Sequence, residues 1–307
     1  MHPPVEAIKI QKGMNADDLV KAMRGAGVMG AGRMGKAAEI LEKVFTNSDC
    51  RTFFGFAGAL VPGGMKGIII DMLESGVIDV MVTTGANLTH DLAEAFGHRH
   101  YQGSHHADDE ALNKIGLVRM FDTYMPNKVY EDLEDFFEKH YDSFKDLETI
   151  KEFLWKIGEL MPSTEKSILK TCYEKKIPLF CPGIADSGIG LMIWGRLAQG
   201  KKCQVKAFED LKEMMDLAWT AKQAGVIYLG GGLPKNFIQQ AMQLAPNAAS
   251  YGVQITMDRP EPGGSSGAEL CEGISWGKME PQAKFVDVIC DVTIALPVLW
   301  AAVKNRI

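Results

Sequence analysis

One lysine near the carboxyl end of the chain stands among residues that favour amine chemistry. Residues 272–278 read Glu-Gly-Ile-Ser-Trp-Gly-Lys. A lysine attacks carbon only through a neutral amine, and an apolar neighbour such as Trp276 favours the neutral form of Lys278 by excluding water. If residues 272–276 are helical, Glu272 and Trp276 share one face, where the carboxylate could hold an ammonium group of a cationic substrate and the ring could shield that substrate. Lysines are almost always solvated surface residues. The spacing alone therefore does not distinguish a reactive Lys278 from an ordinary solvated lysine.

Strand-like segments alternate with amphipathic segments along the chain. We expect strands at residues 52–57, 78–83, 177–181, 226–229, 251–256 and 285–290. We expect helices at residues 36–45, 66–74, 131–144, 149–160, 165–174, 208–224 and 236–244. This alternation predicts βαβ units, and right-handed crossovers then give an α/β, doubly wound, mostly parallel Rossmann-like sheet with helices on both faces. No linker divides the chain, so we predict a single domain over residues 1–307, with a polar loop and charged helices inserted around 97–165.

The glycines near the start of the chain fit a dinucleotide fingerprint by letter only. Residues 25–30 and 30–35 both read Gly-x-Gly-x-x-Gly. That motif binds a pyrophosphate only when a strand comes directly before its first glycine. Residues 15–23 have the pattern of a capped helix instead. We therefore predict a turn between two closely packed helices.

Ligands of open parallel sheets bind beyond the carboxyl ends of the strands, and three motifs are expected there. The strand at 78–83 ends in Thr-Thr-Gly-Ala, with hydroxyls and unhindered amides. The strand at 226–229 ends in three glycines, 230–232, before a helix beginning near Pro234, which suits an anion. Asp186 follows the strand at 177–181 and could accept ribose hydroxyls. Each motif could instead be a tight turn or a helix cap, and for the three glycines the two interpretations are equally supported.

Residues 98–109 contain four histidines and two aspartates, which are suitable ligands for zinc or iron. Their spacing matches neither a His-Glu-x-x-His helix nor a tetrahedral set. We therefore expect no metal, and we predict a loop at the mouth of a substrate site or at a subunit contact.

The composition excludes several classes of partner. Hydrophobic residues make up 46% and charged residues 23% of the 307 residues, and the net charge is −6. Such a chain has no overall basic field for nucleic acid or for an anionic membrane. The six cysteines form no Cys-x-x-Cys pair, and the first residues lack the pattern of a signal peptide. We expect a cytoplasmic protein with neither nucleic-acid nor membrane partners.

Several motifs together resemble the deoxyhypusine synthase family. The segment 263–278, which includes Ser-Trp-Gly-Lys, is similar to the active-site segment of that family. Further similar motifs occur in the family's order at residues 82–87, 180–186, 229–232 and 291. The resemblance extends over most of the chain and implies an NAD-binding homotetramer that needs no metal. It implies NAD contacts at Thr84, Gly85, Asp186 and Asp291, and further candidate cofactor contacts are Gly231 and Ser266.

The resemblance also implies an activity, that of a transferase. An aminobutyl group passes from a spermidine-like donor to Lys278 as an imine, and from Lys278 to an acceptor amine, while NAD is regenerated. Trp276 and Glu272 are the expected amine contacts, in a closed pocket that protects the imine. The acceptor of the family is a lysine of the hypusine-bearing translation factor, which would then be a protein partner beside the small polyamine substrate.

Four positions depart from the family's pattern. His90 stands in place of a glutamate and Asn236 in place of a histidine that holds spermidine. Leu191 and Ser265 occupy further positions that are acidic in the family. Fewer carboxylates attract a triamine less strongly, and an unpaired buried ammonium is costly. His90 and Asn236 remain candidate substrate contacts, but the donor or the acceptor can differ.

Three alternatives follow from these departures. The first is transfer to a free diamine such as putrescine, as in homospermidine formation. The second is an NAD-dependent dehydrogenase of a related small amine, which would accumulate NADH. The third is a catalytically silent NAD-binding protein, in which Lys278 has no chemical role.

Overall fold

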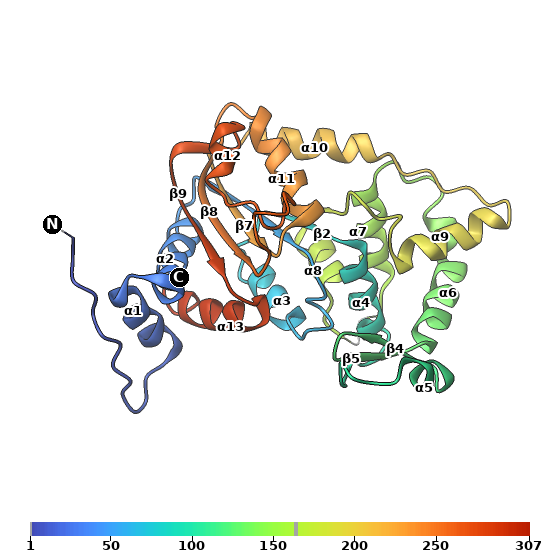
Figure 1. Cartoon of the computed structure of the whole chain (residues 1–307). Coiled ribbons are helices and arrows are strands. Elements are labelled where there is room, and N and C mark those ends of the chain that lie inside the picture. The colour runs from blue at the N-terminus through green and yellow to red at the C-terminus, as the bar shows by residue number, and fades with distance from the viewer. Residues whose placement is uncertain (1, 163–164) are drawn as a thin grey trace. The chain divides into compact units, whose positions relative to one another are not determined.

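The computed structural model describes residues 2–162 and 165–307, and it has an α/β fold. Contacts divide the chain into two compact units (Figure 1). The first unit comprises the residues up to Ala57 together with Val77–Val82 and Lys212–Ile307, and the second comprises Gly58–Gly76 and Thr83–Leu211. Each unit buries large aromatic side chains of its own, such as Phe53 in the first and Phe137 in the second.

The first unit is built on a parallel sheet. Its strands are β1 (Cys50–Phe56), β2 (Val80–Thr83), β7 (Gln223–Leu229), β8 (Ala249–Thr256) and β9 (Met279–Ile289), in the order β2-β1-β7-β8-β9. The pairs β1–β7, β7–β8 and β8–β9 are parallel. Parallel strands covered on both faces are apolar along their length, and every residue of β2 is buried. These strands confirm five of the predicted segments.

Helices cover both faces of this sheet. Side chains alternate along a strand, so residues three apart on β7 point to opposite faces. A Cβ atom at Gly225 would lie 2.7 Å from Val44 of α2 (Met29–Phe45). Tyr228 instead accepts a hydrogen bond of 3.3 Å from Gln239 of α11 (Gly232–Leu244). α2 and α11 therefore lie on opposite faces, and α13 (Val292–Val303) packs against α2 (Figure 1), as predicted for a doubly wound fold.

The glycines near the start of the chain form a tight helix–helix turn, as predicted. α1 (Ala16–Ala26) is followed by Gly27, whose φ of 72° closes the helix in a left-handed conformation. A Cβ atom at Gly32 would lie 2.3 Å from the Gly27 carbonyl carbon, and one at Gly35 would lie 2.5 Å from Arg24 Cα. These glycines allow α1 and α2 to approach each other closely.

The second unit consists mainly of helices. They are α3 (Lys66–Glu74), α4 (Gly85–Ala95), α5 (Asp109–Lys114), α6 (Lys128–His140), the short 3-10 helix η1 (Tyr141–Ser143), α7 (Ile150–Leu160), α8 (Ile168–Lys175) and α9 (Gly188–Ala198). The two-residue strand β6 (Leu179–Phe180) lies within the predicted segment 177–181. Phe137, Phe144 and Phe153 pack together with ring centroids 5.2–6.3 Å apart, which joins α6 to α7.

The region 97–165 contains the predicted helices and also a small sheet that was not predicted; residues 163–164 lie outside the described residues. β3 (Tyr101–Gln102), β5 (Thr123–Pro126) and β4 (Leu117–Met120) form an antiparallel sheet in that order. Part of the segment predicted as a polar loop is therefore strand. Elements of two to four residues are too short to show the alternation by which strands are recognised.

Other helices differ from the prediction for identifiable reasons. α10 (Ala207–Trp219), which the two units share along the chain, ends five residues before the predicted limit. The Thr220 hydroxyl donates to the Asp216 carbonyl oxygen at 2.8 Å, and Gln223 already belongs to β7.

The sequence did not predict α4, α9 or α13. α9 and α13 are apolar on most sides and carry glycines or Pro297, so neither shows a helical period of polar residues.

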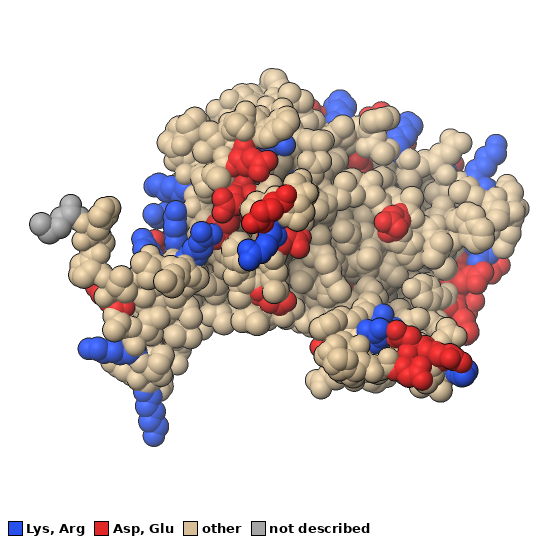
Figure 2. Space-filling view, viewed as in Figure 1, with Lys and Arg blue, Asp and Glu red and all other residues tan. Residues whose placement is uncertain are grey.

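Both signs of charge are present on the face drawn in Figure 2, and much of that face carries no charged residue. Within residues 2–162 and 165–307, no helix combines the length and the apolar character that crossing a bilayer requires. All six cysteines are free thiols.

Candidate active-site residues in the two units

Lys278 lies at the junction between a helical turn and a strand of the first unit. α12 (Glu272–Ser275) ends at Trp276, and Gly277 then takes a φ of 70°. This conformation turns the chain so that the Lys278 amide donates to the Gly273 carbonyl oxygen at 2.8 Å. The next residue, Met279, begins β9. The lysine is therefore held by regular elements on both sides.

The Lys278 amine lies over the indole ring of Trp276. Nζ is 4.9 Å from the ring centroid, and the Lys278 side chain is half-buried. α12 covers residues 272–275, so the helix includes Glu272 and ends directly before Trp276, which is its C-cap. Trp276 is 57% exposed, however. In a single copy of the chain, the ring therefore shields the Lys278 amine on one side only. The apolar wall expected from the sequence stays a prediction, supported by the contact between Nζ and this ring.

A second lysine, Lys235, lies in the same unit and was not found from the sequence. It is 5% exposed, and its Nζ donates to the Ala268 carbonyl oxygen at 2.5 Å. Burial lowers the pKa of Lys235 to about 8, although the carboxylates of Asp287 and Glu272 oppose this shift and the charge of Lys278 adds to it. One signal was available: Lys235 precedes the buried residues Ile238, Gln239 and Met242 at helical spacing on α11.

The glycine turn after β7 packs against the segment that contains Ser266. A Cβ atom at Gly231 would lie 2.3 Å from Ser266 Cα, so only glycine permits this approach. Gly230 and Gly232 have φ angles of 75° and 57°, and a Cβ atom at Gly232 would meet nothing within 4 Å. The turn therefore leaves open space at the N-terminus of α11, where the Gly231 cap supplies no side-chain hydrogen bond. Backbone amides at such a turn suit a phosphate.

Two further candidate residues of the first unit have defined positions. Asn236 is half-buried on α11 beside Lys235. Asp291 is the N-cap of α13, and its Oδ1 accepts from the Thr293 amide at 2.7 Å and from the Thr293 hydroxyl at 2.5 Å. Oδ1 of Asp291 is therefore used to cap α13.

Three candidate residues of the second unit lie at the start of two helices. Thr84 is the N-cap of α4, and Asp186 is exposed in the turn before Ser187, which is the N-cap of α9. A Cβ atom at Gly85 would lie 2.5 Å from Ser187 Cβ. The fold thus brings Thr84, Gly85 and Asp186 to neighbouring helix N-termini, where hydroxyl, amide and carboxylate groups suit a nucleotide.

His90 lies on α4 and contacts the histidine-rich stretch. Its Nδ1 is 3.0 Å from His100 Nε2. Burial lowers the pKa of His90 to about 4; the charge of His100 adds to this shift and Glu94 opposes it. His98 pairs with Asp132. Among the residues that the structure describes, no three His, Cys, Asp or Glu side chains are arranged to hold a metal ion.

The buried lysine gives a stability prediction with a defined sign. We expect the free energy of unfolding of the wild-type chain, relative to a Lys235→Met variant, to rise as the pH increases from about 8 to 10.5. In this window the folded chain has released the Lys235 proton, whereas the unfolded chain still binds it. The slope is at most about 1.4 kcal/mol per pH unit. Urea unfolding of both proteins at several pH values measures this slope. If the difference in free energy of unfolding between the two proteins did not change with pH, the lowered pKa of Lys235 would be contradicted.

Comparisons with known proteins place this geometry in context. A family model described as deoxyhypusine synthase matches residues 18–303. The chain is 43% identical over 305 residues to "Probable deoxyhypusine synthase 1" of Methanosarcina acetivorans, a match that covers 99% of this chain and 95% of the relative. It is 40% identical over 302 residues to "Probable deoxyhypusine synthase 1" of Archaeoglobus fulgidus, with 98% of both chains covered. The fold is similar to a crystal structure assigned as a deoxyhypusine synthase from Entamoeba histolytica, with a TM-score of 0.63 at 18% identity over 96% of this chain and 94% of that one.

Proposed function

Because the chain belongs to the deoxyhypusine synthase family, we propose that this transferase moves an aminobutyl group from a spermidine-like polyamine, through an imine on Lys278, to an acceptor amine, with NAD as cofactor. The observation that supports this best is the position of Lys278, whose amine lies 4.9 Å from the Trp276 ring on a turn closed by Gly277. The ring provides an apolar wall for the amine, and Glu272 provides a carboxylate within the same turn.

Each unit by itself offers groups that suit part of a dinucleotide. In the first unit, the open space over Gly232 and the amides around Gly231 are suited to phosphate, with Ser266 packed beside them. In the second unit, Thr84, Gly85 and Asp186 offer hydroxyl, amide and carboxylate groups. Asp291 would contribute Oδ2, since Oδ1 caps α13. When bound, NAD would supply the oxidation of the amine donor and the later reduction of the product.

Lys278 performs the carbon–nitrogen exchange. Its neutral Nζ adds to the imine carbon of the oxidised donor, the bond from that carbon to the old nitrogen breaks, and 1,3-diaminopropane leaves with both hydrogens of the Nζ amine. The acceptor amine then adds to the same carbon, and Lys278 leaves in the same way. Each exchange conserves the imine, so no water is consumed. Glu272 would pair with an ammonium end of the chain that is being transferred.

Transfer to a free diamine such as putrescine is the second candidate. His90 and Asn236 carry no charge that could hold an additional ammonium group, and Leu191 and Ser265 stand where the family has acidic residues. Residues of this kind would suit a substrate with fewer charges than spermidine. We rank a protein acceptor, the hypusine-bearing translation factor, slightly above a free diamine, because the relatives carry the name deoxyhypusine synthase.

The proposal includes a cytoplasmic homotetramer. α9 exposes large apolar side chains, with Leu191 55%, Trp194 66% and Leu197 46% exposed. Surfaces of this kind are commonly covered by another protein chain. The proposal is that further copies of this chain cover the apolar side chains of α9.

An amine screen with NAD tests the proposal. The protein is incubated with NAD and spermidine, alone, with putrescine, and with the purified translation factor, and products are identified by mass. We expect 1,3-diaminopropane to appear together with an aminobutylated acceptor, while NADH does not accumulate. Accumulation of NADH without a transferred group would support an amine dehydrogenase instead. No product in any of these incubations, or in a further one with agmatine, would contradict both the transferase and the dehydrogenase.

A further inference from the structure

We infer that Lys235 is a positioning residue for Lys278: its side chain ties the main chain at Ala268 to the first turn of α11 and so holds the segment that carries Lys278. The inference rests on the proposed function, because it concerns the step that Lys278 performs. All three residues belong to the first unit. The role assigned to Lys235 acts through the main chain of this segment, not through contact with the substrate.

Buried side chains fix the main chain directly before α12. Lys235 Nζ donates to the Ala268 carbonyl oxygen at 2.5 Å, and Gln254 Nε2 of β8 donates to the same oxygen at 3.0 Å. The Leu270 amide donates to the two carboxylate oxygens of Asp287 of β9 at 3.1 Å and 3.3 Å. Lys235, Gln254 and Asp287 are 5%, 1% and 7% exposed. One helix and two strands therefore hold this stretch of main chain.

The same face of α11 lies against the turn that presents Lys278. Gln239 is one helical turn after Lys235, so the two side chains share a face. A Cβ atom at Gly273 would lie 3.3 Å from Gln239 Oε1 and 3.5 Å from Lys278 Cβ. Burial lowers the pKa of Lys235 most, and the charge of Lys278 lowers it further, which agrees with this proximity. Lys235 is therefore close enough to influence how Lys278 is held.

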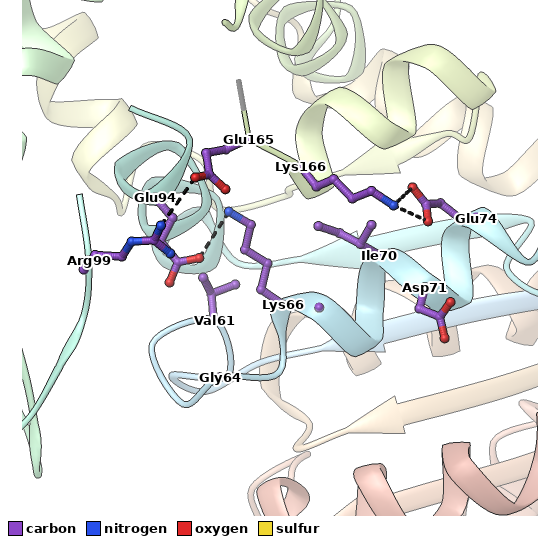
Figure 3. Close-up of a pocket in the computed structure, with 11 residues that line it drawn as sticks. Val61, Gly64, Lys66, Ile70, Asp71, Glu74, Glu94, Arg99, Glu165 and Lys166 are labelled. Atoms are coloured by element: carbon purple, nitrogen blue, oxygen red, sulfur yellow. Dashed lines mark hydrogen bonds and ion pairs between the residues drawn. The ribbon is translucent and has the colours of Figure 1, made fainter. Parts of the chain in front are cut away.

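Lys66 is a nearly buried lysine of the second unit, and it differs from Lys235 in its partners. The Lys66 side chain is 11% exposed, and its Nζ lies 3.1 Å from Glu94 and 3.5 Å from Asp91. Figure 3 shows Lys66 reaching toward Glu94. Among the residues that the structure describes, the Ala268 oxygen is the one polar contact of Lys235 Nζ. A buried ammonium without a carboxylate partner lowers stability, so ion pairing does not account for Lys235.

The reaction at Lys278 depends on where its amine is held. A displacement of about 1 Å in a reacting group can lower a rate about a hundredfold. The start of α11 holds the segment before α12 at two points, because Gly231, the N-cap of α11, also packs against Ser266. Release of the Ala268 oxygen from Lys235 would leave α12 and the Lys278 turn less firmly placed.

Lys235→Met separates this tether from the stability of the fold. Ala268 keeps the hydrogen bond from Gln254, so no buried carbonyl group is left unpaired. We expect the urea midpoint at pH 7 to equal or exceed that of the wild type, because a buried ammonium without a carboxylate partner is removed. Lys66→Met should lower the midpoint, because it leaves two carboxylates without their cation. Hydrogen exchange in the peptide 268–278, measured without substrate, should be faster in Lys235→Met.

The kinetics of transfer test the role in the reaction. For Lys235→Met we expect kcat, measured as 1,3-diaminopropane released, to fall about a hundredfold. The KM for NAD should stay within about twofold of the wild-type value, because the glycine turn is unchanged. Lys235→Arg keeps a buried donor and should recover most of kcat. The matched control is Lys284→Met, an exposed position on β9, which should leave kcat, KM and hydrogen exchange at wild-type values.

The outcomes separate this inference from the proposed function. A Lys235→Met protein with the wild-type kcat would overturn the inference and leave imine formation at Lys278 intact. A urea midpoint well below that of the wild type would make Lys235 a residue of the fold and would also overturn the inference. A loss of kcat with unchanged hydrogen exchange in the peptide 268–278 would mean that Lys235 does not act by positioning. A wild-type protein that released no 1,3-diaminopropane would overturn the proposed function, and the role of Lys235 with it.

Discussion

Replacing Lys278 by alanine is expected to lower aminobutyl transfer by at least about a thousandfold, because removal of a covalent nucleophile eliminates the step that it carries. Lys278→Arg should be equally inactive. The guanidinium keeps the positive charge beside the Trp276 ring but does not lose its proton in proteins, so it cannot form an imine. The pair of variants thus distinguishes a nucleophile from a residue that contributes only charge. Rates are measured as 1,3-diaminopropane released with spermidine and NAD.

A matched control is available on the neighbouring strand. Lys284 is exposed on β9, and Lys284→Ala should retain wild-type turnover. Both inactive variants should still oxidise the donor slowly, so a small accumulation of NADH without transfer is expected. Turnover by Lys278→Ala at the wild-type rate would remove Lys278 from the mechanism, and with it the imine pathway.

The second large effect is expected on stability, at Asp91. This carboxylate is 0% exposed and accepts from the Ser167 hydroxyl at 2.8 Å, the Ile168 amide at 3.0 Å and the Leu169 amide at 2.9 Å. It also lies 3.5 Å from Lys66 Nζ. Asp91→Ala leaves donors at the start of α8 unpaired and leaves Lys66 with one carboxylate fewer. We expect the free energy of unfolding to fall by about 3–5 kcal/mol, which is the usual cost of removing one partner of a buried pair.

Asp91→Asn tests the contribution of charge at constant shape. Its side-chain oxygen still accepts one of the hydrogen bonds, so the loss should be smaller, on the order of 1–3 kcal/mol. Asp109→Ala removes an exposed partner of Arg119 and should change stability far less, since water solvates both groups. Urea unfolding monitored by circular dichroism measures all three variants. An Asp91→Ala variant as stable as the wild type would show that water can replace this carboxylate.

The sequence predicts the sheet of the first unit well because its strands are continuous apolar runs that end in recognisable turns. The glycines at 25–35 were also interpreted correctly, since the absence of a preceding strand is visible in the sequence. α9 could not be predicted in this way. Its residues Gly188–Ala198 are almost entirely apolar, and Arg196, its only charged residue, is buried against Glu134 and Glu138. A helix without a polar face shows no period.

The candidate site residues also divide into those that the sequence predicts and those that only the structure reveals. Lys278, Trp276 and the glycine turn stand in motifs that can be read from the sequence. Other groups meet from distant parts of the chain: Lys66 of α3 contacts Glu94 of α4, and Glu94 contacts His100, which directly precedes β3, so no spacing rule links the three. Lys235 was overlooked because lysines are usually solvated, although its place among buried residues of α11 was visible. Tertiary contacts, rather than local patterns, determine which charged groups are buried.

Borohydride reduction of the protein during incubation with spermidine and NAD, followed by mass analysis of its peptides, tests the central claim most directly. The account predicts a reduced aminobutyl adduct on the peptide that contains Lys278, dependent on both NAD and the amine and absent from Lys278→Arg. An adduct on Lys235 in place of Lys278, or no adduct with spermidine, putrescine or agmatine, would contradict it.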